Sequence, residues 1–285
     1  MIVITGGTGK LGSRIVQRLL GLVPAEQVGV SVRDVGRAGD LGVRVRRGDF
    51  GDPQSLAEAF EGASQVLIVS ANETGGKAVE SHVTAIEAAV KAGAGRILYT
   101  SHQGAAEDSL FAPMPDHAAT EAHLAETGTP FTVLRNGFYA STVPQLLGAA
   151  LETGELIAPA DGPVSWTAHA DLAEAAAIIL ASDGSFEGPT PPLTAPVALD
   201  LTDAARILTE LTGRTIRRVV ADDEEWVASL TGHGVPAPQA RLLLGMFHAS
   251  RRGEFAEVNP ELERLLGRPA TPLRSVLAEA IGAAA

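Results

Sequence analysis

The chain of 285 residues contains no cysteine and no long apolar run. Without cysteine it can form no disulfide framework, no thiolate metal site and no cysteine nucleophile. No apolar run approaches the roughly 18 residues that span a bilayer, and the first residues form no basic leader, so we expect neither membrane insertion nor export. These absences agree with the cytoplasmic location that we predict, without a membrane partner.

Basic residues are in the minority, since 22 Lys and Arg stand against 34 Asp and Glu and the formal net charge is -12. Nucleic-acid binding usually depends on a basic face that releases counterions, so we expect no nucleic-acid partner. The 7 histidines are scattered, and none stands in an H-x-x-x-H or H-E-x-x-H arrangement, which argues against a metal site. No G-x-S-x-G motif supports a hydrolase.

The segment IVITGGTGKLG, residues 2–12, predicts a buried strand, a glycine turn and the start of a helix. Gly6, Gly9 and Gly12 allow a tight turn, a close approach to a pyrophosphate and close helix packing, while the free N–H groups of the helix favour an anion. A purely structural turn would use the same residue type. Because this turn follows a strand and opens a helix, we predict that it binds a dinucleotide. The expected contacts are Gly6, Thr8, Gly9, Lys10 and Leu11.

A second strand, predicted over residues 28–32, ends just before Arg33. At this position of a dinucleotide-binding fold an acidic residue accepts from the ribose 2′-hydroxyl, whereas an arginine accommodates a 2′-phosphate. Arg33, with Arg37 nearby, therefore favours NADPH over NADH, because a planar guanidinium can bind phosphate through two hydrogen bonds. The alternative is that Arg33 is a solvated charge and that Asp34 binds the ribose.

Strands and helices alternate strictly through the first half of the chain. Further strands are predicted over residues 43–46, 66–70, 96–101 and 131–134. This order predicts an α/β fold with a Rossmann-type doubly wound parallel sheet, which binds its ligand at the carboxyl ends of the strands. The strand ends add Asp49, Phe50, Ser70, Ala71 and Asn72 to the expected cofactor contacts. Asp49 and Phe50 are equally well explained as a turn aspartate and a core aromatic.

Beyond residue 150 the alternation loosens. Helices are predicted around residues 170–181, 201–211, 222–230, 238–251 and 273–281, while the proline-rich segment 188–192 can form only an edge strand or a loop. We therefore predict an NADP-binding Rossmann domain over residues 1–150, with residues 165–185 packing back on it. Residues 151–285 are expected to form a smaller, mainly helical C-terminal lobe that binds the substrate.

The chain resembles the NmrA-like group of atypical short-chain dehydrogenase/reductases, and within it most closely the type-2 NADPH:quinone oxidoreductases and the triphenylmethane dye reductases. Tyr99-Thr100-Ser101, Thr120-Glu121, the LRNG segment at 134–137 and the LLG segment at 265–267 carry this likeness. The resemblance implies NADP(H) as cofactor, contacted by Ser101 and by a wall beside the nicotinamide. By the same resemblance, that wall is expected to consist of Asn136, Gly137, Phe138 and Tyr139. The same family contains NADP-binding sensors that are not enzymes.

Two departures from neighbouring families bear on the chemistry. Conventional short-chain reductases use a tyrosine and a lysine four residues later as proton donor and activator, whereas this slot holds His117 and Glu121. A carbonyl reductase must protonate a developing alkoxide, but a quinone forms a phenolate-like anion whose conjugate acid has a pKa of roughly 10. A cationic dye carbon needs no proton at all. We therefore expect an acceptor that is already electron-poor. His169 stands where relatives carry an arginine, which leaves the physiological acceptor open.

The catalytic candidates are Tyr139, His117 and Asn136. Tyr139 can hydrogen-bond an acceptor oxygen or stack on a flat ring, and it is equally explained as a half-buried core aromatic. His117 titrates in the range of an acid, or contacts the cofactor instead. Glu121 either orients His117 at i, i+4 or is solvated. His102 has a weaker claim of the same kind.

Two more residues have structural alternatives. Trp166 either lines the pocket or belongs to the core, and Asp171 is expected to cap a helix.

Together these observations predict an NADPH-dependent oxidoreductase that transfers hydride to an electron-poor planar acceptor such as a quinone. The alternatives are a reductase of an enone, imine or dye-like substrate, including a biosynthetic one, and a non-catalytic NADP(H) sensor of the NmrA type. A homodimer is left open.

Overall fold

A parallel sheet of seven strands organises the chain. The computed structural model describes residues 1–39, 41–182 and 186–282. The strand order is β3-β2-β1-β4-β5-β6-β8, and every pairing is parallel. The strands are β1 (Ile2–Thr5), β2 (Val28–Val32), β3 (Arg44–Arg47), β4 (Gln65–Ile68), β5 (Arg96–His102), β6 (Phe131–Asn136) and β8 (Gly188–Pro189). The order reverses at β1, which confirms the predicted doubly wound fold.

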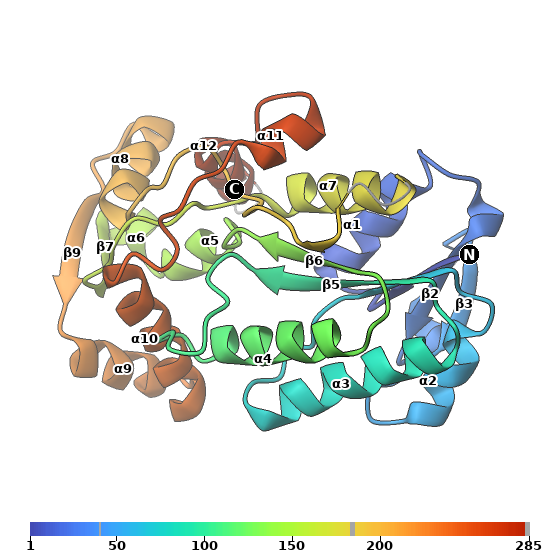
Figure 1. Cartoon of the computed structure of the whole chain (residues 1–285). Coiled ribbons are helices and arrows are strands. Elements are labelled where there is room, and N and C mark those ends of the chain that lie inside the picture. Colours follow the sequence, from blue (N-terminus) through green and yellow to red (C-terminus); the bar gives the residue numbers. More distant parts are fainter. Residues whose placement is uncertain (40, 183–185, 283–285) are drawn as a thin grey trace.

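Helices cover both faces of the sheet, as Figure 1 shows. On one face lie α1 (Lys10–Leu19) and α7 (His169–Ala181), which pack against each other. On the other face lie α2 (Pro53–Phe60), α3 (Gly76–Lys91) and α4 (Pro113–Glu126). Two short 3-10 helices, η1 (Ala25–Gln27) and η2 (Val35–Arg37), flank β2. Each face therefore buries its own apolar core.

Local sequence signals explain where these helices begin. The Asp52 carboxylate accepts the backbone N–H of Ser55 at 3.2 Å, and Pro53 occupies the first turn of α2, where its missing N–H costs nothing. In α1, Leu11, Ile15 and Leu19 are buried along one face, as their helical spacing predicts.

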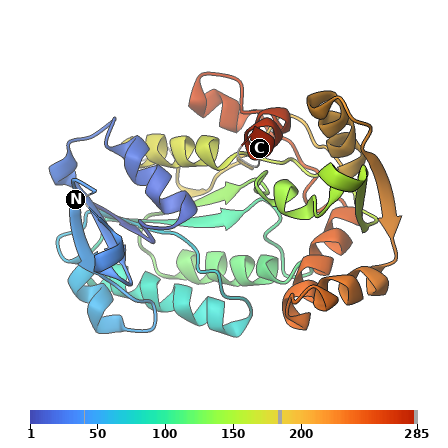
Figure 2. The same ribbon diagram turned by 180° about the vertical axis from the view of Figure 1, so that it is seen from behind.

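The C-terminal region lies beyond the carboxyl ends of β5 and β6, at one end of the molecule (Figures 1 and 2). It contains a second, two-stranded parallel sheet of β7 (Glu155–Pro159) and β9 (Arg217–Ala221). Its helices are α5 (Thr142–Leu146), α6 (Ala150–Thr153), α8 (Leu201–Thr212), α9 (Asp223–Gly232), α10 (Ala237–Arg251), α11 (Glu261–Leu266) and α12 (Leu273–Gly282). The four later helices predicted from periodicity are confirmed, whereas β7, β9 and α11 were not predicted.

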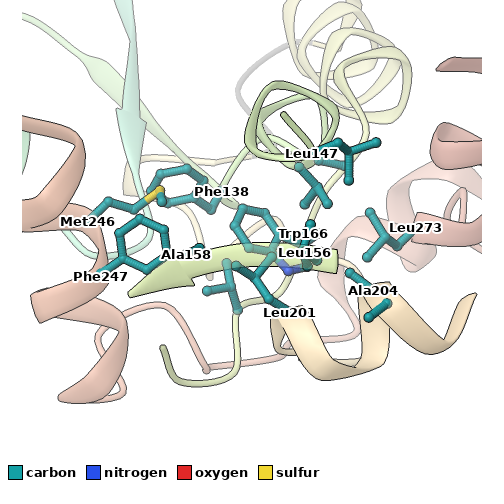
Figure 3. Close-up of a cluster of buried hydrophobic side chains, with 14 of the residues drawn as sticks. Phe138, Leu147, Leu156, Ala158, Trp166, Leu201, Ala204, Met246, Phe247 and Leu273 are labelled. Atoms are coloured by element: carbon teal, nitrogen blue, oxygen red, sulfur yellow. The ribbon is translucent and has the colours of Figure 1, made fainter. Parts of the chain in front are cut away.

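A third apolar core fills this region (Figure 3). Trp166, Leu201 and Phe247 belong to it, together with Met114 and Phe138 from before residue 150. Leu262 of α11 instead packs into the core beneath α1 and α7. The domain boundary at residue 150 stays a prediction, and residues 183–185 and 283–285 of the predicted segments lie outside the described residues. Every helix in the described ranges is too short or too polar to cross a membrane.

Candidate functional site

The residues proposed from the sequence meet at one edge of the sheet, because all seven strands are parallel and their carboxyl ends point the same way. Gly6 follows β1, Arg33 follows β2, and Ser70 follows β4. Ser101 is the second-last residue of β5, and Asn136 is the last residue of β6. In the ladder between these strands, Ser101 is the register partner of Arg135. Ligands of open α/β sheets bind at this edge, beside the strand at which the order reverses. Here that strand is β1.

The turn between β1 and α1 is packed so tightly that it requires glycine. A Cβ on Gly12 would lie 2.3 Å from the Gly6 carbonyl oxygen, and Gly6 itself has a φ of 62°. Thr8, Gly9 and Lys10 are exposed, while the Leu11 side chain is buried in the core, so Leu11 offers a ligand only its backbone N–H. The first-turn N–H groups of α1 have no partner within the helix. This arrangement fits a bound pyrophosphate.

The exposed arginines Arg33 and Arg37 lie at the β2 end of this edge. The Asp34 carboxylate accepts the backbone N–H of Gly36 at 2.9 Å and so caps η2. Across the edge, Lys77 and Ser81 hydrogen-bond Glu73 and lower the pKa of its carboxyl, and the positive charge of Arg33 adds to this effect. Asp34 is thus engaged in a local turn, and Arg33 keeps its guanidinium at the surface.

Asp49 and Phe50 follow β3 at the outer edge of the sheet. The Asp49 carboxylate accepts the backbone N–H of Gly51 at 3.0 Å, and the Asp49 N–H donates to the Ser55 hydroxyl at 3.0 Å. Phe50 is half-buried against the core that lies under α2 and α3. These contacts are those of a turn aspartate and a core aromatic, the alternative that the sequence left open.

The loop after β4 is held by three separate elements. The backbone N–H of Ser70 donates to the Thr100 hydroxyl at 2.9 Å, and that of Ala71 donates to Nε2 of His82 at 2.9 Å. Further along, the Gly75 N–H donates to Asp116 at 2.6 Å. Asn72 itself is exposed. The position of residues 70–75 therefore depends on α3, β5 and α4 together.

His82, Tyr99 and His117 form a buried hydrogen-bond network between α3, β5 and α4. Because His82 Nε2 accepts from Ala71, its proton lies on Nδ1, which is 3.0 Å from the Thr120 hydroxyl and 3.2 Å from the Tyr99 hydroxyl. The Tyr99 hydroxyl also lies 2.7 Å from His117 Nδ1 and so links the two imidazoles. The network thus assigns a tautomer to His82.

Burial leaves both imidazoles neutral. It lowers the pKa of His82 to about 4, and together with the neighbouring His82 it lowers the pKa of His117 to about 3. A neutral His117 can donate one hydrogen bond but holds no spare proton near neutral pH. Its role as a proton donor stays a prediction.

Glu121 corrects an expectation. Its carboxylate is buried, accepts the Ser101 hydroxyl at 2.5 Å and pairs with Arg135 at 2.7 Å. It therefore neither orients His117 nor projects into solvent, and instead ties the ends of β5 and β6 to α4. Asp171 is corrected as well, because α7 begins after Ala168 without a side-chain cap.

The loop after β6 forms the wall next to the C-terminal region. A Cβ on Gly137 would lie 2.2 Å from the Thr167 hydroxyl, so only glycine fits there. Tyr139 stacks on His169 with ring centroids 4.1 Å apart. Burial raises the pKa of Tyr139 to about 12, while a hydrogen bond with Asn136 acts in the opposite direction. Phe138 packs edge-on against Trp166, which is a core residue with 3% of its surface exposed.

Sequence reasoning missed His82 and Phe255 at this site. His82 lies mid-helix in α3, and Phe255 follows α10 far along the chain, so neither stands in a motif. Phe255 packs 4.9 Å from Phe138, ring centroid to ring centroid. In the described part of the chain, no group of three or more His, Asp or Glu residues is arranged to hold a metal ion.

Comparisons with known proteins agree with this geometry. A sequence model of the NmrA-like family matches residues 1–278. Quinone oxidoreductase 2 of Escherichia coli (strain K12) is 34% identical over 277 residues, which are 96% of this chain and 96% of that protein. The crystal structure of the Escherichia coli NADPH-dependent quinone oxidoreductase complexed with NADPH has a TM-score of 0.92 at 33% identity, covering 99% of this chain and 100% of that one. Citrobacter sp. triphenylmethane reductase complexed with NADP(H) also has a TM-score of 0.92, at 34% identity over 98% and 100% of the two chains.

Proposed function

The chain belongs to the NmrA-like family, and from this premise we propose that it is an NADPH-dependent oxidoreductase that transfers hydride to an electron-poor planar acceptor, with a quinone as first choice. Its relatives named for quinone reduction and for triphenylmethane reduction match it over nearly the whole chain, and both were crystallised with NADPH or NADP(H). When bound, the nicotinamide supplies the hydride. The protein's task is to hold it against the acceptor.

The observation that best supports NADPH as the cofactor is the glycine turn before α1, with exposed Arg33 at the end of the neighbouring strand β2. In this proposal the turn and the first-turn N–H groups of α1 hold the pyrophosphate, and Arg33 with Arg37 binds the 2′-phosphate. The other residues proposed to contact NADPH are Thr8, Lys10, Asp49, Phe50, Ser70, Ala71, Asn72, Ser101, Asn136, Gly137 and Phe138.

The acceptor is inferred from the groups that can supply a proton. The slot of the usual tyrosine holds His117, whose pKa burial lowers to about 3, and the lysine slot holds the buried, paired Glu121. Burial also raises the pKa of Tyr139 to about 12, which makes it a weak acid. An acceptor whose product anion is stable without immediate protonation suits such a site. Quinones have this property, and a cationic dye suits the site as well because hydride makes it neutral, so that its product needs no proton.

Three narrower points belong to this proposal. A cytoplasmic location and the absence of a nucleic-acid partner follow from composition and charge alone. A homodimer stays open. The rival function is an NADP(H) sensor that binds the cofactor without turnover. A sensor would not oxidise NADPH in the presence of any acceptor, whereas the enzyme would.

The test is to mix the protein with NADPH and a panel of quinones, enones and cationic dyes and to follow the oxidation of the nicotinamide by its absorbance. Saturable turnover of quinones, with NADPH preferred over NADH, is the expected result. Tight cofactor binding without turnover across the whole panel would favour the sensor and overturn the enzyme.

A pair of glycine variants controls this test. Gly12→Ala should lose cofactor binding and turnover, because the added Cβ would meet the Gly6 carbonyl. Gly232→Ala, at a helical position where a Cβ meets nothing within 4 Å, should keep both. Circular dichroism of each variant separates a lost site from a lost fold.

A further inference from the structure

His102, the last residue of β5, carries a buried hydrogen-bond donor that has no partner. Its Nδ1 accepts the backbone N–H of Gly104 at 3.0 Å, so its single proton lies on Nε2. Only 8% of His102 is exposed, and among the described residues nothing accepts a hydrogen bond from Nε2. Buried donors are normally paired, and this unpaired one lies at the edge of the sheet where ligands of such folds bind.

An unpaired acceptor lies on the adjacent strand. Asn136 is the register partner of His102 in the parallel ladder of β5 and β6. It is 2% exposed, and its Oδ1 likewise has no hydrogen-bond partner within the described ranges. A donor and an acceptor thus stand unsatisfied side by side, where the two strands end.

Aromatic rings surround the imidazole. Phe138 lies with its ring centroid 5.2 Å from that of His102 at an interplanar angle of 81°, and Phe255 lies at 5.4 Å and 80°. Phe255 is held in place by its carbonyl oxygen, which accepts from Gln103 Nε2 at 2.7 Å. These rings make the surroundings of the imidazole apolar and aromatic. They also strengthen a hydrogen bond formed there, because water is excluded.

The imidazole is neutral, since burial, together with the neighbouring His117, lowers the pKa of His102 to about 3. The group therefore acts as a fixed N–H dipole and not as a cation or an acid. Such a dipole can stabilise negative charge that develops on an oxygen without transferring its proton.

We propose that His102 is a further catalytic residue, whose Nε2–H donates a hydrogen bond to the carbonyl oxygen of the acceptor. The inference rests on the proposed reductase function. It states how the site would bind those acceptors that are planar conjugated carbonyl compounds. As the hydride adds to the conjugated system with its electron pair, the π electrons of the carbonyl move to its oxygen, and the oxyanion forms against Nε2–H. The oxyanion later takes its proton from water, and His102 keeps its own.

Two kinds of acceptor separate this role from a structural one. A quinone develops charge on oxygen, whereas a cationic triphenylmethane dye accepts hydride at carbon and becomes neutral. His102→Leu should lower kcat/KM for a quinone about 100-fold, the usual effect of removing one oxyanion donor. The same variant should change dye reduction and NADPH affinity by less than about threefold. His102→Gln, which retains an N–H donor, should recover part of the quinone activity.

An equal loss with quinone and dye, or no loss with either, would overturn the proposal. A second measurement does not depend on turnover. In the wild-type protein saturated with NADP⁺, the Nε2 proton resonance of His102, identified by its absence from the Leu variant, should move when a redox-inactive aryl ketone is added. It should not move when the aryl ring without the carbonyl is added.

The two proposals fail in different ways. If the wild-type protein reduces no member of the panel, the proposed function fails, and the NMR measurement still decides whether His102 binds a carbonyl oxygen. If quinones are reduced but His102→Leu retains full activity, the role of His102 alone is wrong.

Discussion

Arg33 is the residue on which cofactor choice depends in this proposal. It follows β2 with its side chain exposed, while the neighbouring Asp34 is engaged with Gly36 in the cap of η2. A carboxylate committed to a local turn is less available to a ribose 2′-hydroxyl, whereas an exposed guanidinium remains available to a phosphate. The geometry therefore favours the first of the two alternatives that the sequence left open.

Arg33→Asp should reverse or abolish the preference for NADPH. The substitution replaces a phosphate donor by a group that repels phosphate and can accept from a free hydroxyl, so the ratio of NADPH to NADH affinity should fall at least about tenfold. Fluorescence titration with each cofactor measures the two affinities. Arg217→Asp is the control, because Arg217 is an exposed arginine of β9 that is not among the proposed cofactor contacts, and it should leave the ratio unchanged. An unchanged ratio in Arg33→Asp would refute the 2′-phosphate assignment.

Asp171, in the first turn of α7, binds residues from the C-terminal end of the chain. The carboxylate is fully buried and accepts from Arg268 at 2.9 Å and from the Thr271 N–H at 2.6 Å and hydroxyl at 3.1 Å. These bonds join α7 to the segment between α11 and α12. Asp171 therefore attaches the end of the chain to the helix that packs on α1.

Asp171→Ala should lower the free energy of unfolding by about 1–3 kcal/mol, because the partly buried Thr271 N–H loses its acceptor. Glu174→Ala is the matched control. Glu174 also contacts Arg268, at 2.6 Å, but its side chain is 23% exposed, and exposed ion pairs contribute little. Urea unfolding followed by circular dichroism measures both variants. Equal losses would mean that the buried anchor contributes no more than the surface pair.

The molecule as a whole should be sensitive to mild acid. Burial lowers the pKa of His82 to about 4, of His102 to about 3, of His117 to about 3 and of His169 to about 4. In the unfolded chain these groups titrate near about 6.5. Between the two values the unfolded state binds more protons than the native state, so stability falls as the pH falls below about 6.5 and is unaffected by these groups above it.

Each buried histidine that stays neutral in the native state should lower the free energy of unfolding by about 1.4 kcal/mol for each unit by which the pH falls within this window. Urea unfolding at pH 7.5, 6.5 and 5.5 measures the slope. His82→Gln should reduce it, because one protonation site is removed, whereas His233→Gln, at an exposed position after α9, should leave it unchanged. A slope that His82→Gln does not alter would contradict the burial argument.

The alternation of strands and helices, the glycine turn and the position of Arg33 were all predictable, because each is encoded by neighbours in the sequence. A buried strand is a local apolar run, and a glycine turn is a local backbone requirement. Once the parallel order is known, the strand ends must meet at one edge, and so the candidate residues of the first 150 positions could be gathered without coordinates. The family resemblance added the wall around Asn136 on the same basis.

The contacts across elements could not be predicted in this way. The strands β7 and β9 pair over a separation of about sixty residues, and neither is long enough to show a clear alternation. His82, Tyr99 and His117 come from three elements, and Glu121 lies within reach of His117 by helical spacing yet binds Ser101 and Arg135. Spacing states which side chains share a helix face but not what packs against that face. The tautomers of the imidazoles, the unpaired Nε2–H of His102 and the burial of Asp171 therefore arise from packing between distant segments, because only folding removes water from these groups and sets their partners.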